Sequence, residues 1–132
     1  MPAIRSTRRK QLNATEIAIV AARAAAEKLA TDVVVLEVGD IIGITEAFVL
    51  ASGSNTRQVK AICDEVEFAL KVEADLSPRS TEGLADASWV LMDYGELVVH
   101  VFGVETREYY DLERLWSDAP RVDWDPGHRA VS

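Results

Sequence analysis

The chain has 132 residues, of which 48% are hydrophobic. This length predicts one domain with a core large enough to fold without disulfide bonds or a structural metal. The single cysteine, Cys63, excludes a disulfide framework and fits a reducing compartment. No apolar run is long enough to cross a membrane, and the first ten residues lack the apolar stretch of a secretion signal, so we expect a cytoplasmic protein.

The charge is distributed unevenly along the chain. Four of the 14 basic residues lie in residues 1–10, so the other 122 residues hold ten basic and 22 acidic residues, a net charge of −12. Domains that bind nucleic acid are generally basic, because they neutralise phosphates, whereas an acidic domain is attracted to basic surfaces, including those of proteins. We predict a basic flexible arm over 1–12, one domain over 13–122 and a tail over 123–132.

The first expected element is a helix that begins at Asn13. Glu16 follows three residues later, which is typical of a capping box, and the alanine-rich run that follows favours helix to about Ala30. One face of this helix is expected to be apolar and to carry Ile17, Val20, Ala21, Ala24 and Leu29.

Two strands and a second helix are expected next. The apolar runs at 33–38 and 46–52 predict strands, and the seven residues between them are too few for a crossover, so the strands should be antiparallel. The second helix should run from Asn55, its cap, to about Glu73. Cys63 lies in the apolar stripe of this helix, so we interpret it as a core residue.

The second half of the chain predicts a hairpin and a last helix. Apolar runs at 88–93 and 97–103 flank a short loop with glycine, which favours a hairpin. Because a helix precedes this hairpin, one parallel pairing in the sheet is expected. A last helix is predicted over 105–116. The fold class is therefore α/β or α+β, with a mixed β-sheet of about five strands and flanking helices.

Gly53 and Ser54 precede the second helix, where many proteins bind a phosphate. Such loops usually hold several glycines and a lysine, but here there is one glycine and neither GK[ST] nor GxGxxG. We favour a tight turn with a helix cap; the alternative is a nucleotide-binding or nucleotidyltransferase-like enzyme that uses this loop. The acids such an enzyme would need, Glu65 and Glu67, lie in a predicted helix, where residues two apart do not face each other.

The histidines and serines suggest no enzyme site. His100 lies within a strand and His128 in the tail, so no zinc ligand cluster is expected with a single cysteine. A triad of Ser52 or Ser54 with His100 and Asp93 has no nucleophile-elbow motif to support it. We therefore predict no catalytic residue, no metal site and no cofactor.

The predicted hairpin carries a mixed face. If Gly95 and Glu96 form a two-residue turn, Asp93 lies opposite Val98, whereas a three-residue turn would change this pairing. The two-residue register places four side chains on one face: Trp89, Asp93, His100 and Phe102. This face is either half of a core or a protein-binding patch, because tryptophan and tyrosine are enriched at interface hot spots.

Several blocks of the sequence resemble the Iojap family, the bacterial ribosomal silencing factors: VLASGSNTRQVKAICDEV, EG followed by WVLMDYGELVVHVF, and REYYDLERLW. The resemblance covers about residues 14–122. It implies a nucleotidyltransferase-like topology without an active site. It also implies a translation repressor that binds the large ribosomal subunit through its fourteenth protein and blocks subunit joining when nutrients are scarce. A homodimer of the free protein is plausible within the family.

The resemblance also implies a set of partner-binding residues. The motifs W-x-x-x-D-Y-G and R-x-[FY]-Y-D-L-E, with the strand between them, place these residues at Trp89, Asp93, Tyr94, Gly95, His100, Arg107, Tyr109 and Tyr110. The second motif continues through Asp111, Leu112 and Glu113. Thr81 stands where the family usually has a basic residue. The basic arm is expected to add only weak, salt-sensitive contact to rRNA. A self-associating scaffold, with the hairpin as its dimer contact, is a further alternative.

Overall fold

A mixed sheet of six strands, in the order β3-β4-β5-β2-β1-β6, organises the described part of the chain. The computed structural model describes residues 12–111, 114 and 116–125. Its elements are α2 (Ala14–Glu27), β1 (Thr31–Glu37), α3 (Gly39–Ile42), β2 (Ala47–Gly53), α4 (Thr56–Ala74), β3 (Ser80–Glu82), β4 (Trp89–Asp93), β5 (Leu97–Gly103), α5 (Val104–Tyr110) and β6 (Arg121–Val122). The predicted mixed α/β class is confirmed.

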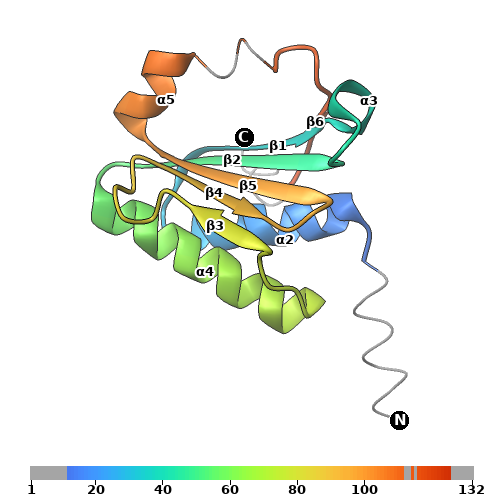
Figure 1. Cartoon of the computed structure of the whole chain (residues 1–132), viewed down its shortest axis with the longest axis horizontal. Helices are drawn as coiled ribbons and strands as arrows, with labels where there is room; N and C mark the ends of the chain where they lie inside the picture. The colour runs from blue at the N-terminus through green and yellow to red at the C-terminus, as the bar shows by residue number, and fades with distance from the viewer. Residues whose placement is uncertain (1–11, 112–113, 115, 126–132) are drawn as a thin grey trace.

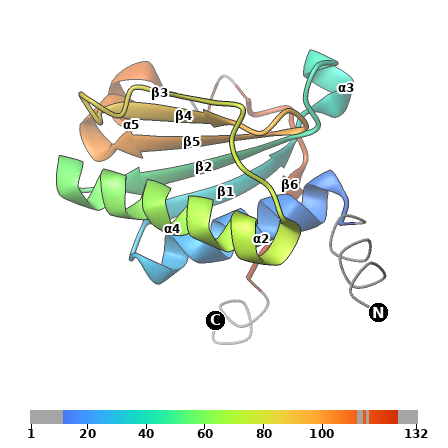
Figure 2. The same ribbon diagram turned by 60° about the horizontal axis from the view of Figure 1, so that its bottom comes forward.

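Helices α2 and α4 lie side by side against one face of the sheet (Figures 1 and 2). The alanines of α2 let the two helices approach closely, and the apolar stripe of α4 meets the inward-facing residues of β2, β4 and β5. Cys63 is buried in this core, as predicted, and burial raises the pKa of its thiol to about 12. The thiol is therefore neutral at physiological pH, which suits a packing residue.

The capping box predicted for the first helix is present. The Asn13 side chain accepts a hydrogen bond from the Glu16 backbone N–H (2.8 Å), and the Glu16 side chain accepts one from the Asn13 N–H (2.9 Å). The helix ends at Glu27 rather than near Ala30, because Leu29 adopts a left-handed conformation with φ 63°. Leu29 is 78% exposed, so its predicted place on the apolar face is wrong.

The predicted strand pairings are confirmed. Strands β1 and β2 are antiparallel, β4 and β5 form an antiparallel hairpin, and β2 pairs with β5 in parallel, with Gly53 opposite Gly103. The helix α4 forms the crossover between β2 and the hairpin, which is why this single pairing is parallel.

The connection after α4 contains β3, which is the fifth strand of the predicted sheet. Three features differ from the predictions. The link between β1 and β2 contains the short helix α3, which ends at Gly43 with φ 83°. A sixth strand, β6, pairs with β1. The last helix stops at Tyr110, because Asp111 adopts φ 51° and caps it. The predicted continuation to residue 116 includes 112–113 and 115, which lie outside the described residues.

The described residues cover the second face of the sheet only in part. Helix α5 lies over one end of this face and α3 over the other (Figure 1). A smaller apolar cluster lies on this face and contains Leu36, Phe48, Leu50 and Phe102, with the half-buried Trp89, Val98 and Trp116 packed against it. The predicted hairpin face belongs to this side of the sheet. No helix among the described residues is long and apolar enough to cross a membrane.

Gly53 is required by close packing at the end of β2. A Cβ atom at this position would lie 3.1 Å from both the side chain and the backbone nitrogen of Val59, in the first turn of α4. We expect Gly53→Ser to lower the free energy of unfolding by about 1–3 kcal/mol, the usual cost of overpacking. The measurement is urea unfolding, with Gly103→Ser as the control.

Gly103 is a suitable control because it pairs with Gly53 at the equivalent strand end. A Cβ atom there meets only the Ser88 carbonyl, at 3.9 Å, and serine is a good residue for the N-cap position that Gly103 holds. We expect Gly103→Ser to change the free energy of unfolding by less than about 0.5 kcal/mol. Equal losses in the two variants would contradict the packing argument.

Candidate partner-binding surface

The hairpin adopts the register predicted from a two-residue turn. Asp93 lies opposite Val98, and the Tyr94 N–H donates to the Leu97 carbonyl at 2.8 Å across Gly95 and Glu96. Gly95 has φ 91°, which glycine adopts without strain. The Asp93 side chain accepts a hydrogen bond from the Gly95 N–H (2.8 Å), so this carboxylate also holds the turn. The four predicted side chains therefore share one face.

His100 lies at the centre of this face among aromatic rings. Its exposed fraction is 8%; the Phe48 ring meets it edge-on at 4.7 Å between centroids, and the Phe102 ring stacks at 5.9 Å. Its Nδ1 accepts a hydrogen bond from the Trp89 indole N–H (3.2 Å), so the neutral ring carries its proton on Nε2. Nε2 has no hydrogen-bond partner among the described residues. Burial lowers the pKa of His100 to about 4.

This depressed pKa predicts a pH dependence of stability. In the unfolded chain the imidazole binds a proton below about pH 6.5, whereas the buried ring of His100 stays neutral until about pH 4. The free energy of unfolding should therefore fall as the pH drops from 6.5 to 4, by up to about 3 kcal/mol. Urea unfolding of wild type and His100→Gln at pH 7, 5.5 and 4 tests this. Equal pH dependence in both proteins would contradict it.

Two exposed tyrosines continue the surface onto α5. Tyr109 is 81% exposed and Tyr110 53% exposed, and their rings are 5.0 Å apart between centroids. Tyr110 lies 5.5 Å from the Trp89 ring, which in turn lies 5.2 Å from Phe102. Each of these aromatic rings thus contacts the next, from Phe102 in the interior of the second face to Tyr109 at its exposed end.

Besides His100, two predicted partner-binding residues are buried and support this surface from within. Arg107 is 4% exposed, and its guanidinium donates to the Asp32 carbonyl (2.7 Å) and the Ser52 hydroxyl (2.9 Å), which fastens α5 to the sheet. Tyr94 is 6% exposed and points into the core on the side of α4, where burial raises its pKa. We therefore place both residues in the supporting structure. Leu112 and Glu113 lie outside the described residues.

A groove of about 770 Å³ adjoins the hairpin turn, and the sequence did not predict it. Its lining includes Asp93, Gly95 and His100 from the hairpin and, in addition, Ile42, Ile44, Thr45, Phe48 and Trp116. Ile44 is 86% exposed at its rim. The one available signal was the three isoleucines in the link GDIIGIT, because several apolar residues in a short connection can form an exposed apolar patch.

The groove is acidic. Its lining contains three carboxylates, Glu46, Asp93 and Glu96, against the single cation Arg79. Arg79 lies 4.0 Å from the Asp93 carboxylate, and its side chain is 71% exposed, so this ion pair contributes little to stability. Together with the neutral His100, these groups give the groove negative charge that suits a basic partner.

The Gly53-Ser54 loop forms the turn and cap that were predicted. The Asn55 side chain caps α4 by accepting from the Gln58 N–H (2.8 Å). The Gln58 side chain accepts hydrogen bonds from the Ser54 N–H (2.6 Å) and hydroxyl (2.9 Å), and it donates to the Lys28 and Leu29 carbonyls, both at 3.0 Å. A phosphate bound here would have to displace Gln58 from all four contacts.

The other arrangements weighed for an enzyme do not come together among the described residues. Glu65 and Glu67 both lie within α4, and no group of three or more potential metal ligands is found in the described part of the chain. The Ser52 hydroxyl is bonded to Arg107, and the proton-accepting nitrogen of His100 is bonded to Trp89. Neither is arranged as a member of a triad.

Comparison with known proteins identifies the family. Residues 11–131 match the family model described as ribosomal silencing factor during starvation (RsfS). A ribosomal silencing factor of Bacillus subtilis is 39% identical over 119 residues, which cover 88% of this chain and 98% of that protein. The mouse protein named mitochondrial assembly of ribosomal large subunit protein 1 is 36% identical over 93 residues, 67% of this chain and 40% of that protein.

A solved structure agrees with these sequence matches. The crystal structure of a Chromobacterium violaceum protein superposes with a TM-score of 0.75 at 34% identity, over 80% of this chain and 88% of that chain. The family match spans nearly the whole chain, including all three sequence blocks and the surface assembled above. The chain therefore belongs to the family of ribosomal silencing factors, as those blocks predicted.

Proposed function

We propose that this protein represses translation by binding the large ribosomal subunit through its fourteenth protein and blocking its union with the small subunit. We expect this repression of translation to operate in the cytoplasm when nutrients are limited. The family description, which names silencing during starvation, and the mouse relative's name, which refers to the large ribosomal subunit, support this proposal.

The observation that carries the proposal is the surface on the second face of the sheet. It combines exposed aromatic side chains at one end, Tyr109 and Tyr110, with the acidic groove beside Asp93 at the other. Ribosomal proteins present basic side chains, whereas rRNA presents phosphates. An acidic surface with exposed aromatic side chains is therefore complementary to a ribosomal protein. The contact is thus expected with a ribosomal protein, and the basic arm adds at most a weak contact to rRNA.

Blocking of subunit joining requires only steric bulk. A bound protein that buries about 800 Å² on each partner has an interface of standard size. No step of this mechanism needs a nucleophile, a metal or a cofactor. The Ser54 N–H of the Gly53-Ser54 loop is bonded to the Gln58 side chain, and Cys63 and His100 are buried and neutral at physiological pH. These features are consistent with a non-enzymatic role.

A subunit-joining experiment tests the proposal. Purified large and small subunits are mixed with or without the protein, and the fraction that sediments as whole ribosomes is measured on a sucrose gradient. Incubation with the large subunit before mixing should lower this fraction more than incubation with the small subunit. An unchanged fraction at saturating protein would rule out the blocking mechanism.

We also propose that the free protein forms a homodimer through the same surface, in competition with the ribosome. The exposed Tyr109 and Ile44 side chains support such a contact, because a dimer would remove them from water. Sedimentation equilibrium of wild type and Tyr109→Ala tests it, since the variant should dissociate more readily. A variant that associates as strongly as wild type would leave this tyrosine outside any dimer contact.

A further inference from the structure

Among the residues that the structure describes, the outer edge of β1 is covered only by the two-residue strand β6 and the residues that flank it. In an antiparallel ladder, successive residues direct their backbone N–H and C=O groups to alternate sides. The Glu37 N–H donates outward to the Pro120 carbonyl (2.9 Å), so Val35 also directs its backbone groups outward. The Val33 carbonyl faces outward as well, because it accepts a hydrogen bond from the Trp124 indole. An uncovered edge of this kind is a template for pairing with another strand.

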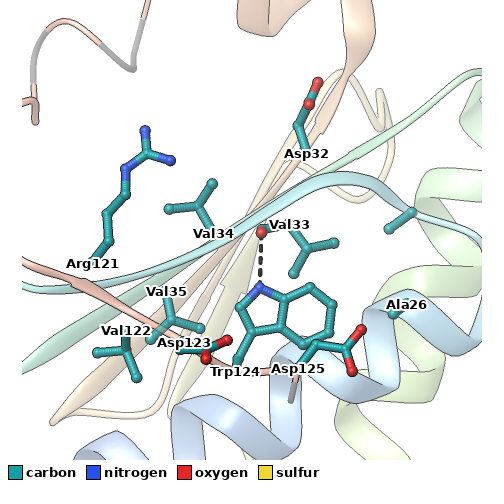
Figure 3. A pocket seen from close by; sticks show the side chains of 11 residues that line it. Ala26, Asp32, Val33, Val34, Val35, Arg121, Val122, Asp123, Trp124 and Asp125 are labelled. Carbon is teal, nitrogen blue, oxygen red and sulfur yellow. Dashed lines mark hydrogen bonds between the residues drawn. The ribbon is translucent and has the colours of Figure 1, made fainter. Parts of the chain in front are cut away.

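The segment from Pro120 to Trp124 makes a hydrogen bond or pairs with each of these three residues of β1. Glu37 is bonded to Pro120, and Val35 pairs with Val122. The next rung of the ladder would use the backbone N–H of Trp124, but here its indole N–H donates to the Val33 carbonyl at 2.9 Å (Figure 3). A side-chain donor thus completes the cover where the strand β6 has ended.

Trp124 fastens this segment to the core and to α2. Figure 3 shows its indole beneath β1, on the side toward Ala26 of α2, and the side chain packs against the main core cluster. The Arg23 guanidinium of α2 donates to the Trp124 carbonyl at 3.2 Å. A cleft of about 600 Å³ nevertheless remains between β1 and residues 121–125, so the segment fills the edge incompletely. Segments held in this way open more readily than the core.

We propose that the segment Pro120–Trp124 is a guard of the β1 edge, and that the edge beneath it is a latent pairing surface for β1 of a second copy. Two antiparallel β1 strands centred on Val35 would set Val33 of each copy opposite Glu37 of the other, so the Glu37 N–H of each copy would donate to the Val33 carbonyl of the other. A two-fold contact of this kind is self-complementary. β3 and β4 lie at the opposite end of the sheet, so this inference is independent of the proposed function.

Truncation after Ala119 tests the pairing surface. Sedimentation equilibrium from 1 to about 100 µM should show a dimer whose dissociation constant is at least about 10-fold lower than that of the full-length chain, about 1.4 kcal/mol of added affinity. Glu37→Pro in the truncated chain should abolish this gain, because proline removes the outward N–H of this exposed residue, which does not donate to β2. A folded truncated chain that associates no more tightly than the full-length chain would overturn the proposal.

Hydrogen exchange in the full-length chain tests the guard even if the truncated chain fails to fold. In Trp124→Ala, the amides of Val35 and Glu37 should exchange at least about 10-fold faster than in wild type. The amides of Val34 and Leu36, which face β2, should keep their rates. The same variant should also dimerise more tightly than wild type. An equal change at all four amides, no change at any, or unaltered association would overturn the proposal.

Discussion

Asp93→Arg is expected to abolish most binding to the large ribosomal subunit. The Asp93 carboxylate lies at the edge of the acidic groove, and its side chain is 31% exposed, so a basic partner can reach it. Loss of one member of an interfacial charge pair costs about 2–5 kcal/mol, and reversal adds repulsion to that loss. The dissociation constant should therefore rise by at least about 30-fold in a co-sedimentation titration.

Two control variants isolate the charge. Asp93 also accepts the Gly95 N–H, so Asp93→Arg removes a bond of the turn, whereas Asp93→Asn keeps an acceptor at that position and removes only the charge. The asparagine variant should fold with wild-type stability and still bind several-fold more weakly. Asp64→Arg makes the same reversal on α4, which covers the other face of the sheet, and should bind like wild type. Equal losses for Asp64→Arg and Asp93→Arg would indicate only a general charge effect.

Trp89→Ala is expected to have the largest effect on stability of the substitutions considered. The indole packs against Phe102 and Tyr110, and its N–H donates to His100. Truncation of a tryptophan leaves a cavity that costs about 3–5 kcal/mol when the residue is fully buried, so about 3 kcal/mol is expected at this half-buried site. The buried Nδ1 of His100 would also lose its donor. Urea unfolding measures the loss.

Two further variants separate the packing of Trp89 from its place in the binding surface. Trp89→Phe keeps an aromatic ring and loses the N–H, so it should recover most of the lost stability. Tyr109→Ala removes a ring that is 81% exposed, so it should leave the free energy of unfolding within about 0.5 kcal/mol of wild type and weaken ribosome binding. If Tyr109→Ala binds like wild type, the aromatic end of the surface does not contact the ribosome.

The local features of the fold were predictable from short stretches of sequence. The two-residue turn at Gly95 and Glu96 and the alternation of the flanking strands define the hairpin register, because side chains in a strand alternate with a period of two. The caps at Asn13 and Asn55 follow in the same way from residues three positions apart. Each of these depends on interactions between near neighbours in the chain.

The groove and the edge cover depend on contacts between distant segments. Ile44 and Trp116 are far apart in the sequence but both line the groove. Their positions depend on the order of the strands in the sheet, which no local sequence pattern predicts. β6 has two residues, which is too short for a periodic signal. The predicted tail boundary at Val122 stays a prediction, although Trp124 beyond it contacts the core.

The motifs of the resemblance contain both exposed and buried side chains. Arg107 and Tyr109 lie two residues apart in one motif, yet Arg107 is 4% exposed and Tyr109 81%. The difference arises from the direction of each side chain on α5, since Arg107 reaches back to Ser52 and Asp32 in other elements. A motif match does not distinguish a residue that contacts a partner from one that positions the helix carrying it.

Co-sedimentation with separated ribosomal subunits tests the central claim most directly. Wild-type protein is incubated with purified large or small subunits, and bound protein is measured in the pellet across a range of concentrations. We expect wild type to pellet with large subunits in a saturable way and to remain in the supernatant with small subunits, and Asp93→Arg to remain in the supernatant with both. Wild type that fails to pellet with large subunits, or a folded Asp93→Arg that pellets as wild type does, would contradict the account.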